Sequence, residues 1–170
     1  MNYKDFLRPG TGASDITPLL NSGAVFGSLI TDLINQFKEI QIDKIACIEG
    51  RGFLLGAPVA YGLKVGLVPI RSPGKLKNKV FSQSFVDYTG KEKTLEIHED
   101  AIKPDEKILL VDDWMETGET NKAALRLIEK CGGQVVGVGV FMDDSKDNLK
   151  EELKKYNYHY LEKVAKQDKF

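Results

Sequence analysis

The chain has 170 residues, a length at which one domain buries a core without disulfides or a structural metal. A net charge of −1 excludes the broad basic field that gathers proteins on nucleic acid or anionic membranes. No apolar run is long enough to span a bilayer. Cys47 and Cys131 lie in apolar contexts typical of buried thiols in a reducing compartment. We expect one cytoplasmic domain over residues 1–170, with no nucleic-acid or membrane partner.

The first half of the chain alternates helical and strand patterns. Ser22 is suited to cap a helix, because apolar residues recur at helical spacing from Val25 to Phe37. Next come a predicted strand over 44–48, a helix over 53–61 closed by Gly62 and a strand over 65–70. Residues 72–94 are polar, lysine-rich and weakly periodic, which indicates an exposed excursion or flexible flap.

The second half resumes this alternation. The predicted elements are a strand over 108–111, a helix over 120–131, a strand over 135–142, a solvated helix bearing Leu149, Leu153 and Tyr156, and a last strand over 158–164. Strands that alternate with helices imply parallel pairing with right-handed crossovers. The predicted fold class is α/β, with a mostly parallel twisted sheet flanked by helices.

One segment, Ile108-Leu-Leu-Val-Asp-Asp-Trp-Met-Glu-Thr-Gly-Glu-Thr120, is the most informative. Asp112 and Asp113 follow an apolar strand, and a Thr-Gly turn then leads into a helix. Carboxylates accept hydrogen bonds from vicinal hydroxyls, while N–H groups at the start of a helix bind phosphate. Ligands of open α/β sheets lie beyond the carboxyl ends of the strands. The pattern favours a sugar-phosphate site over a solvated acidic turn.

Two further turns supply cations at neighbouring strand ends. Glu49-Gly-Arg-Gly52 combines flanking glycines, which permit close approach to the backbone, with the guanidinium of Arg51. Arg71 and Lys75 bracket a Ser-Pro-Gly turn, whereas the later lysines are expected to face solvent. These cations predict a diphosphate clamp. Neither histidine lies in a zinc pattern, so a metal would be Mg²⁺ arriving with ligand phosphates.

These motifs resemble the type I phosphoribosyltransferase family, most closely its adenine branch. The segment from Val111 to Thr120 looks like the family's phosphoribosyl pyrophosphate (PRPP) motif. Three more segments match the adenine branch in order and approximate spacing: Glu49-Gly-Arg-Gly-Phe53, Val68-Pro-Ile-Arg-Ser-Pro-Gly-Lys-Leu76 and Leu95-Glu-Ile-His-Glu-Asp-Ala-Ile102. The resemblance implies a homodimeric enzyme of purine salvage that uses Mg²⁺ to transfer phosphoribose from PRPP to adenine, giving AMP and pyrophosphate.

The resemblance also assigns roles to residues. Asp112 and the catalytic Asp113 would hold the ribose hydroxyls and, through PRPP and water, the metal. Arg51, Arg71 and Lys75 would hold the departing pyrophosphate, under a hood formed by residues 72–94. The 5′-phosphate would be wrapped by Glu116, Thr117, Gly118, Glu119 and Thr120.

The chain departs from the family pattern at four places. Glu116 and Glu119 stand where the family keeps small residues, and Asp87 stands near the position of a glutamate that assists base protonation. Ala13 and Ser14 replace a Phe-Arg pair that stacks on adenine, and Asp143-Asp144 replace an apolar residue against the base. We therefore assign catalysis to Asp87 with Asp113, and base binding to Ala13, Ser14 and Asp144.

Three alternatives stay open at this level. Asp143 or Asp144 can accept from ring N–H or amino groups, which suits hypoxanthine, guanine or a modified purine. A non-catalytic PRPP-binding regulator would keep the phosphate loop and lose the base pocket. A flavodoxin-like binding or receiver domain would leave Arg51, Arg71 and Lys75 unexplained.

Overall fold

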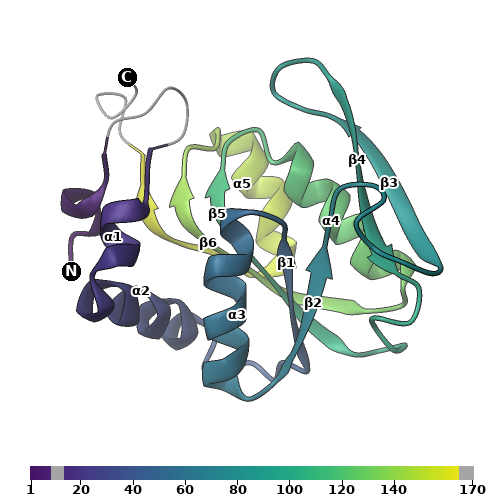
Figure 1. The fold of residues 1–170 in the computed structure, drawn as a ribbon, viewed down its shortest axis with the longest axis horizontal. Coiled ribbons are helices and arrows are strands. Elements are labelled where there is room, and N and C mark those ends of the chain that lie inside the picture. Colours follow the sequence, from purple (N-terminus) through teal and green to yellow (C-terminus); the bar gives the residue numbers. More distant parts are fainter. Residues whose placement is uncertain (9–13, 165–170) are drawn as a thin grey trace.

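A computed structural model describes residues 1–8 and 14–164, and its centre is a five-stranded parallel sheet (Figure 1). The strand order is β2-β1-β5-β6-β7, and β3 and β4 form a separate antiparallel hairpin. The strands are β1 (Lys44–Ile48), β2 (Gly66–Ile70), β3 (Val80–Val86), β4 (Glu92–His98), β5 (Lys107–Met115), β6 (Gln134–Asp143) and β7 (Tyr158–Lys163). The predicted α/β class with a parallel sheet is confirmed.

Helices cover both faces of this sheet. They are α1 (Thr17–Asn21), α2 (Gly23–Gln36), α3 (Arg51–Leu63), α4 (Glu119–Lys130) and α5 (Asp147–Leu153), with 3₁₀ turns η1 (Tyr3–Phe6) and η2 (Lys154–Tyr156). Ser22 caps α2 as predicted, because its hydroxyl accepts a hydrogen bond from the amide of Val25. None of the described helices is long and apolar enough to cross a bilayer.

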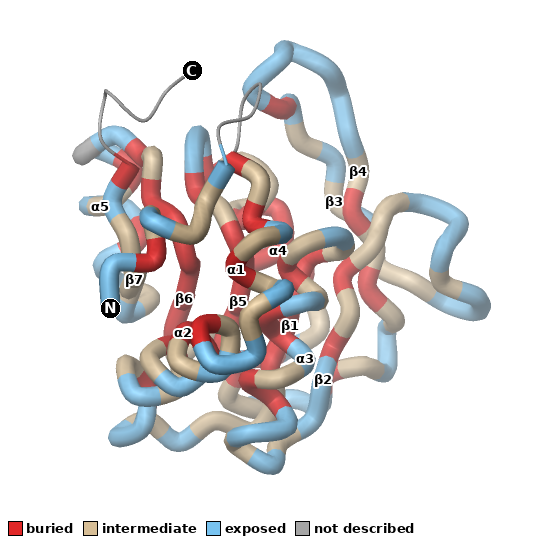
Figure 2. Tube along the Cα trace, turned by 60° about the vertical axis from the view of Figure 1, so that its left-hand side comes forward, coloured by how far each residue is buried: buried red, intermediate tan, exposed pale blue. Residues whose placement is uncertain are grey.

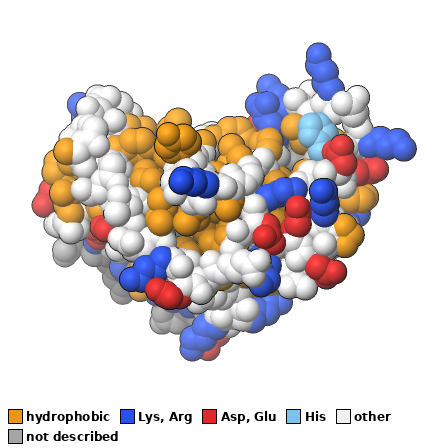
Figure 3. Space-filling view, turned by 90° about the horizontal axis from the view of Figure 1, so that it is seen from below, with side chains coloured by type: hydrophobic (Ala, Val, Ile, Leu, Met, Phe, Trp, Pro, Cys, Tyr) orange, Lys and Arg blue, Asp and Glu red, His pale blue; other side chains and the backbone are white. Residues whose placement is uncertain are grey.

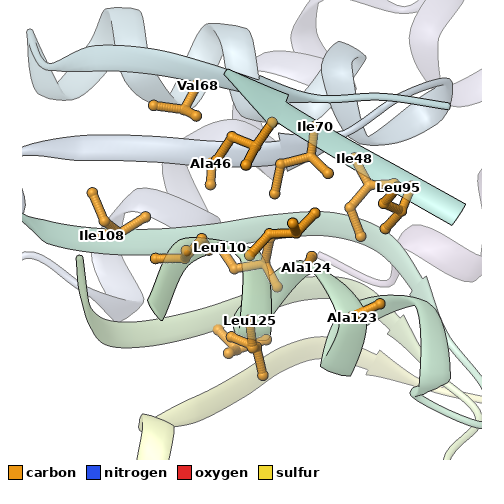
Figure 4. Packing of buried hydrophobic residues seen from close by; sticks show 14 of the residues in the cluster. Ala46, Ile48, Val68, Ile70, Leu95, Ile108, Leu110, Ala123, Ala124 and Leu125 are labelled. Atoms are coloured by element: carbon orange, nitrogen blue, oxygen red, sulfur yellow. The ribbon is translucent and has the colours of Figure 1, made fainter. Parts of the chain in front are cut away.

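Alternating strand residues divide the core into two layers. Ala46 and Leu110 face α4, α5 and the hairpin, whereas Ile45 and Leu109 face α1, α2 and α3. Figure 4 shows the first of these layers packed between the sheet and α4. Burial on both faces explains the unbroken apolar run at the start of β5, and the central strands are accordingly the most buried part of the chain (Figure 2).

The strand order places a topological switch point between β1 and β5. From β1 the chain moves outward to β2 on one side, and later to β6 and β7 on the other side of β5. The helices that leave the carboxyl ends of β1 and β5 are α3 and α4, and they lie in opposite layers. Ligands bind at this position in doubly wound sheets. The segments after Ile48 and Val111 are therefore brought to one edge.

One sequence prediction gains detail, and two need correction. Most residues of the predicted excursion over 72–94 are exposed, as expected, and β3 and β4 form an ordered hairpin in which Leu95 and Ile97 are buried against α4 and the sheet. Gly62 does not close α3, because the helix continues to Leu63 and the left-handed residue after it is Lys64, with φ 57°. The predicted solvated helix buries Leu149 and Leu153, which belong to the core.

Gly56 permits close contact between α3 and β1. A Cβ at this position would lie 2.6 Å from Cys47 Cβ, whereas a Cβ at Gly27 of α2 would meet nothing within 4 Å. We expect Gly56→Ala to lower the free energy of unfolding by about 1–3 kcal/mol through overpacking. We expect Gly27→Ala to raise it by about 0.5–1 kcal/mol through helix propensity. Urea denaturation measures both, and equal effects would contradict the close packing of α3 on β1.

Candidate active site

Asp112 and Asp113 form the centre of the site. The strand predicted to end at Val111 continues to Met115, so both carboxylates project from within β5 and are buried. Asp112 accepts hydrogen bonds from the amide of Asp113 (3.0 Å) and from Asn121 Nδ2 (3.1 Å). A Cβ at Gly52 would lie 2.8 Å from Asp112 Oδ1, so only glycine fits there. The first turns of α3 and α4 thus hold Asp112 between them.

Arg51 connects this pair to the N-terminal segment. Its guanidinium lies 2.8 Å from Asp113 Oδ2 and donates a hydrogen bond of 3.0 Å to the carbonyl of Ser14. The preceding residue, Gly50, has φ 97°, a conformation that favours glycine and lets the turn enter α3 directly. Three predicted site residues therefore meet, although Ser14 contributes its backbone carbonyl.

Burial governs the electrostatics of the two carboxyl groups. Burial, followed by the charge of Asp113, raises the pKa of Asp112 well above its ordinary value. Burial also raises the pKa of Asp113, although Arg51 opposes that shift. Desolvated, incompletely compensated carboxylates favour ligands that bring hydroxyl donors or a cation.

Arg71 is held by a carboxylate that the sequence reasoning did not assign. Glu49 Oε2 lies 3.1 Å from Arg71 Nε, and Glu49 Oε1 accepts a hydrogen bond from the hydroxyl of Ser72. Burial opposes ionisation of Glu49, but the bonds from Ser72 and Arg71 together lower its pKa. Lys75, in the same turn, is exposed. The position of Glu49 before the Gly-Arg-Gly turn was the only sequence signal for this role.

The predicted phosphate loop leads into α4. Gly118 has φ 74° and its carbonyl accepts from the amide of Lys122 at 2.8 Å, which starts the helix at Glu119. Glu116 and Thr117 are exposed, and Thr120 lies in the first helical turn. The loop therefore presents a helix N-terminus at the same sheet edge as the carboxylates.

One carboxylate considered for the base end is closed to ligands. Asp143 is fully buried and bonded to Ser145, Tyr158 and Lys163, so it is not open to a ligand. The amide of Asp144 donates to the carbonyl of Met115 at 2.7 Å, which ties this loop to the end of β5. Ala13, the other predicted base-binding residue, lies outside the described residues.

Asp87 forms the turn of the hairpin. Its Oδ1 accepts from the amide of Thr89 (2.8 Å), the hydroxyl of Thr89 (2.6 Å) and the amide of Lys91 (3.1 Å), while Oδ2 lies 2.9 Å from Lys93 Nζ. The bonds from Thr89 and Lys93 hold the pKa of Asp87 far below its usual range. In this conformation Asp87 is an ionised turn-former and has no proton to donate at neutral pH.

Comparison with known proteins agrees with this arrangement of elements. Residues 12–169 match the family described as the phosphoribosyl transferase domain. The fold and the site thus define a pentosyltransferase of the type I phosphoribosyltransferase class, and the flavodoxin-like or receiver alternative is excluded.

More specific similarities follow. The adenine phosphoribosyltransferase of Desulfitobacterium hafniense is 45% identical over 139 residues, covering 82% of this chain and 80% of the relative. The crystal structure of the enzyme from Thermoanaerobacter pseudethanolicus superposes with a TM-score of 0.86 at 34% identity, covering 95% of this chain and 98% of that one. The Saccharomyces cerevisiae enzyme, crystallised with adenine and an imino-altritol bisphosphate, gives 0.78 at 30% identity, covering 94% and 95%. The chain belongs to the adenine phosphoribosyltransferase family.

Burial of Asp112 predicts that its ionised carboxylate lowers the stability of the protein at neutral pH. Because the folded-state pKa of Asp112 is raised, stability falls as pH rises from the ordinary aspartate value of about 4 through the folded value. An asparagine side chain at this position cannot ionise, and the amide of Asn121 can rotate to keep the hydrogen bond between the two side chains. We expect Asp112→Asn to raise Tm by about 2–4 °C at pH 7.

The difference in Tm should shrink as the pH is lowered toward 4, as measured by calorimetry across a pH series. Asp100→Asn, which removes an exposed carboxylate, should show no such dependence. A variant less stable than the parent at pH 7 would refute the destabilising burial of Asp112.

Proposed function

We propose that the chain transfers phosphoribose from PRPP to adenine and releases AMP and pyrophosphate, a reaction of purine salvage. The observation that carries the proposal is the meeting of the Asp112–Asp113 pair, Arg51 and the N-terminal turn of α4 at the switch point of the sheet. The adenine phosphoribosyltransferases to which the chain is similar support adenine as the base.

Each part of PRPP has a chemical partner at this edge. Asp112 and Asp113 would accept hydrogen bonds from the ribose hydroxyls, while N–H groups of residues 116–120 would bind the 5′-phosphate. Arg51 and Arg71 would exchange their carboxylate partners for the diphosphate, joined by the exposed Lys75. These cations would stabilise negative charge that grows on the leaving diphosphate.

Mg²⁺ fits the donor set when it arrives with the substrate. Residues 1–8 and 14–164 contain no cluster of three or more His, Cys, Asp or Glu side chains that suits a metal. Mg²⁺ in nucleotide sites commonly takes one or two carboxylates with phosphate oxygens and water, and Asp112 and Asp113 would hold it in this indirect way. The ion would supply electrostatic stabilisation of the diphosphate.

The hairpin β3–β4 would act as the hood of the site. Its tip carries exposed Val86 (56%) and Tyr88 (69%), apolar surface suited to excluding water from an oxocarbenium-like transition state. Asp87, between them, would assist base protonation only after release from its turn. We assign the base to the loop carrying Asp144 and to the segment at Ala13 and Ser14.

Two broader proposals accompany the reaction. We infer one domain over residues 1–170, in accordance with the continuous sheet from β2 to β7. We infer a cytoplasmic location, and the free thiols of Cys47 and Cys131 are in keeping with it.

We further propose a homodimer through the outer face of α3 and the edge strand β2. Leu54 (46% exposed), Tyr61 (88%) and Leu67 (43%) leave large apolar side chains uncovered there. Figure 3 shows the molecule from below, and hydrophobic side chains gather near the middle of that view. Large exposed apolar patches on soluble proteins commonly mark such interfaces.

The dimer is tested by the paired substitution Leu54→Arg with Tyr61→Arg. Charges at the centre of an apolar interface oppose association, so the mass by light scattering should fall from twice the chain mass to that of one chain. Tyr88→Arg is the matched control, because it charges another exposed tyrosine on the hairpin and should leave the mass unchanged. A parent protein of single-chain mass would contradict the dimer.

The reaction is tested by incubating the protein with PRPP, Mg²⁺ and adenine, hypoxanthine or guanine while nucleotide and pyrophosphate are measured. We expect turnover of adenine. Asp113→Asn should lower kcat/KM for PRPP about 100-fold, because it removes the charge that opposes Arg51 and faces the ligand. Turnover of hypoxanthine or guanine without turnover of adenine would show that the enzyme uses another base. PRPP binding without turnover would favour a non-catalytic regulator.

A further inference from the structure

Glu119 occupies a demanding position in the predicted phosphate loop. It is the first residue of α4, directly after the left-handed Gly118. The partial positive charge of a helix N-terminus attracts carboxylates as well as phosphates. A free Glu119 carboxylate would therefore compete with a 5′-phosphate for the same N–H groups and repel its charge.

Lys122 pairs with the Glu119 carboxylate. Lys122 Nζ lies 3.2 Å from Glu119 Oε1 and 2.7 Å from Glu152 Oε2, with a side chain that is 25% exposed. The hydrogen bond with Glu152, followed by that with Glu119, raises the pKa of Lys122, so the ammonium stays charged. One lysine thus joins a carboxylate of the loop to a carboxylate of α5.

The position of α5 relative to the loop is fixed by packing. A Cβ at Gly118 would lie 2.5 Å from Leu149 Cδ2, so the loop rests directly on this buried leucine of α5. Lys150 Nζ lies 3.2 Å from the fully buried Asp143, which ties the same helix to the end of β6. Because α5 is anchored twice, Glu152 offers Lys122 a stable second partner.

A simpler interpretation is that the pair of Lys122 and Glu119 is an ordinary surface ion pair, a class that contributes little to stability. The pair of Lys154 and Glu151 represents that class, with the same spacing of three residues and side chains about 70% exposed. Lys122 differs because it is largely shielded, bonds two carboxylates and adjoins the predicted phosphate loop. Lys154 therefore serves as a matched control.

We propose that Lys122 is a positioning residue for PRPP: it holds the Glu119 carboxylate to the side of α4 and leaves the helix N-terminus open to the 5′-phosphate. This inference rests on the PRPP site proposed above. It explains how a loop containing two glutamates can accept a phosphate dianion.

The test compares four variants by steady-state kinetics and by calorimetric titration with PRPP. Lys122→Met should raise KM and Kd for PRPP about fivefold, with KM for adenine and Tm little changed. The defect should shrink as salt increases, because freed Glu119 acts through charge. Lys122→Arg should retain parental values. The double variant Lys122→Met with Glu119→Gln should recover them, and Lys154→Met should match the parent.

The outcomes separate the inference from the function. Parent protein that does not bind PRPP overturns the proposed function and the inference with it. Normal PRPP binding by the parent and equally by Lys122→Met overturns the inference alone. A Lys122→Met defect that Glu119→Gln does not repair also overturns it, because Lys122 would then act on the phosphate itself. Recovery in the double variant, with a salt-sensitive single variant, supports the inference.

Discussion

Burial of two adjacent carboxyl groups on the central strand is the constraint on which the rest of the site depends. Asp112 and Asp113 leave water at the end of β5, and their mutual repulsion is only partly relieved by Arg51. The neighbouring residues accommodate Asp112: Gly52 leaves space for its carboxylate, and Asn121 donates a hydrogen bond to it. A site that holds such a pair is disposed to bind a ligand bringing hydroxyl donors and a cation.

Two arginines at this edge form ion pairs with carboxylates of the protein. Arg51 pairs with Asp113, and Arg71 pairs with Glu49. Such pairs hold each side chain in a defined position while the positive charge remains close to the region proposed for an anionic ligand. Preorganised charge of this kind needs little rearrangement when charge develops in a reaction, which is why it is effective in catalysis.

Helix α5 contacts both ends of the proposed site. Leu149 packs against Gly118 of the predicted phosphate loop, and Lys150 pairs with Asp143 next to the loop proposed for the base. The sequence suggested only a solvated helix here. In the structure its apolar residues Leu149 and Leu153 lie in the core. Local periodicity in a short, highly charged segment does not reveal such burial.

The sequence by itself determined the alternation of strands and helices, the carboxylate pair after the apolar run 108–111, and the cations that follow two other strands. These features depend on local pattern and on the shared edge of a parallel sheet. Only the tertiary structure decided the partners. Asp143 is bonded to Lys163 and Tyr158. Asp87 accepts hydrogen bonds within its own turn, and Glu119 forms an ion pair with Lys122. Whether a carboxylate is available to a ligand depends on which distant donors the fold brings to it, and residue type and spacing do not contain that information.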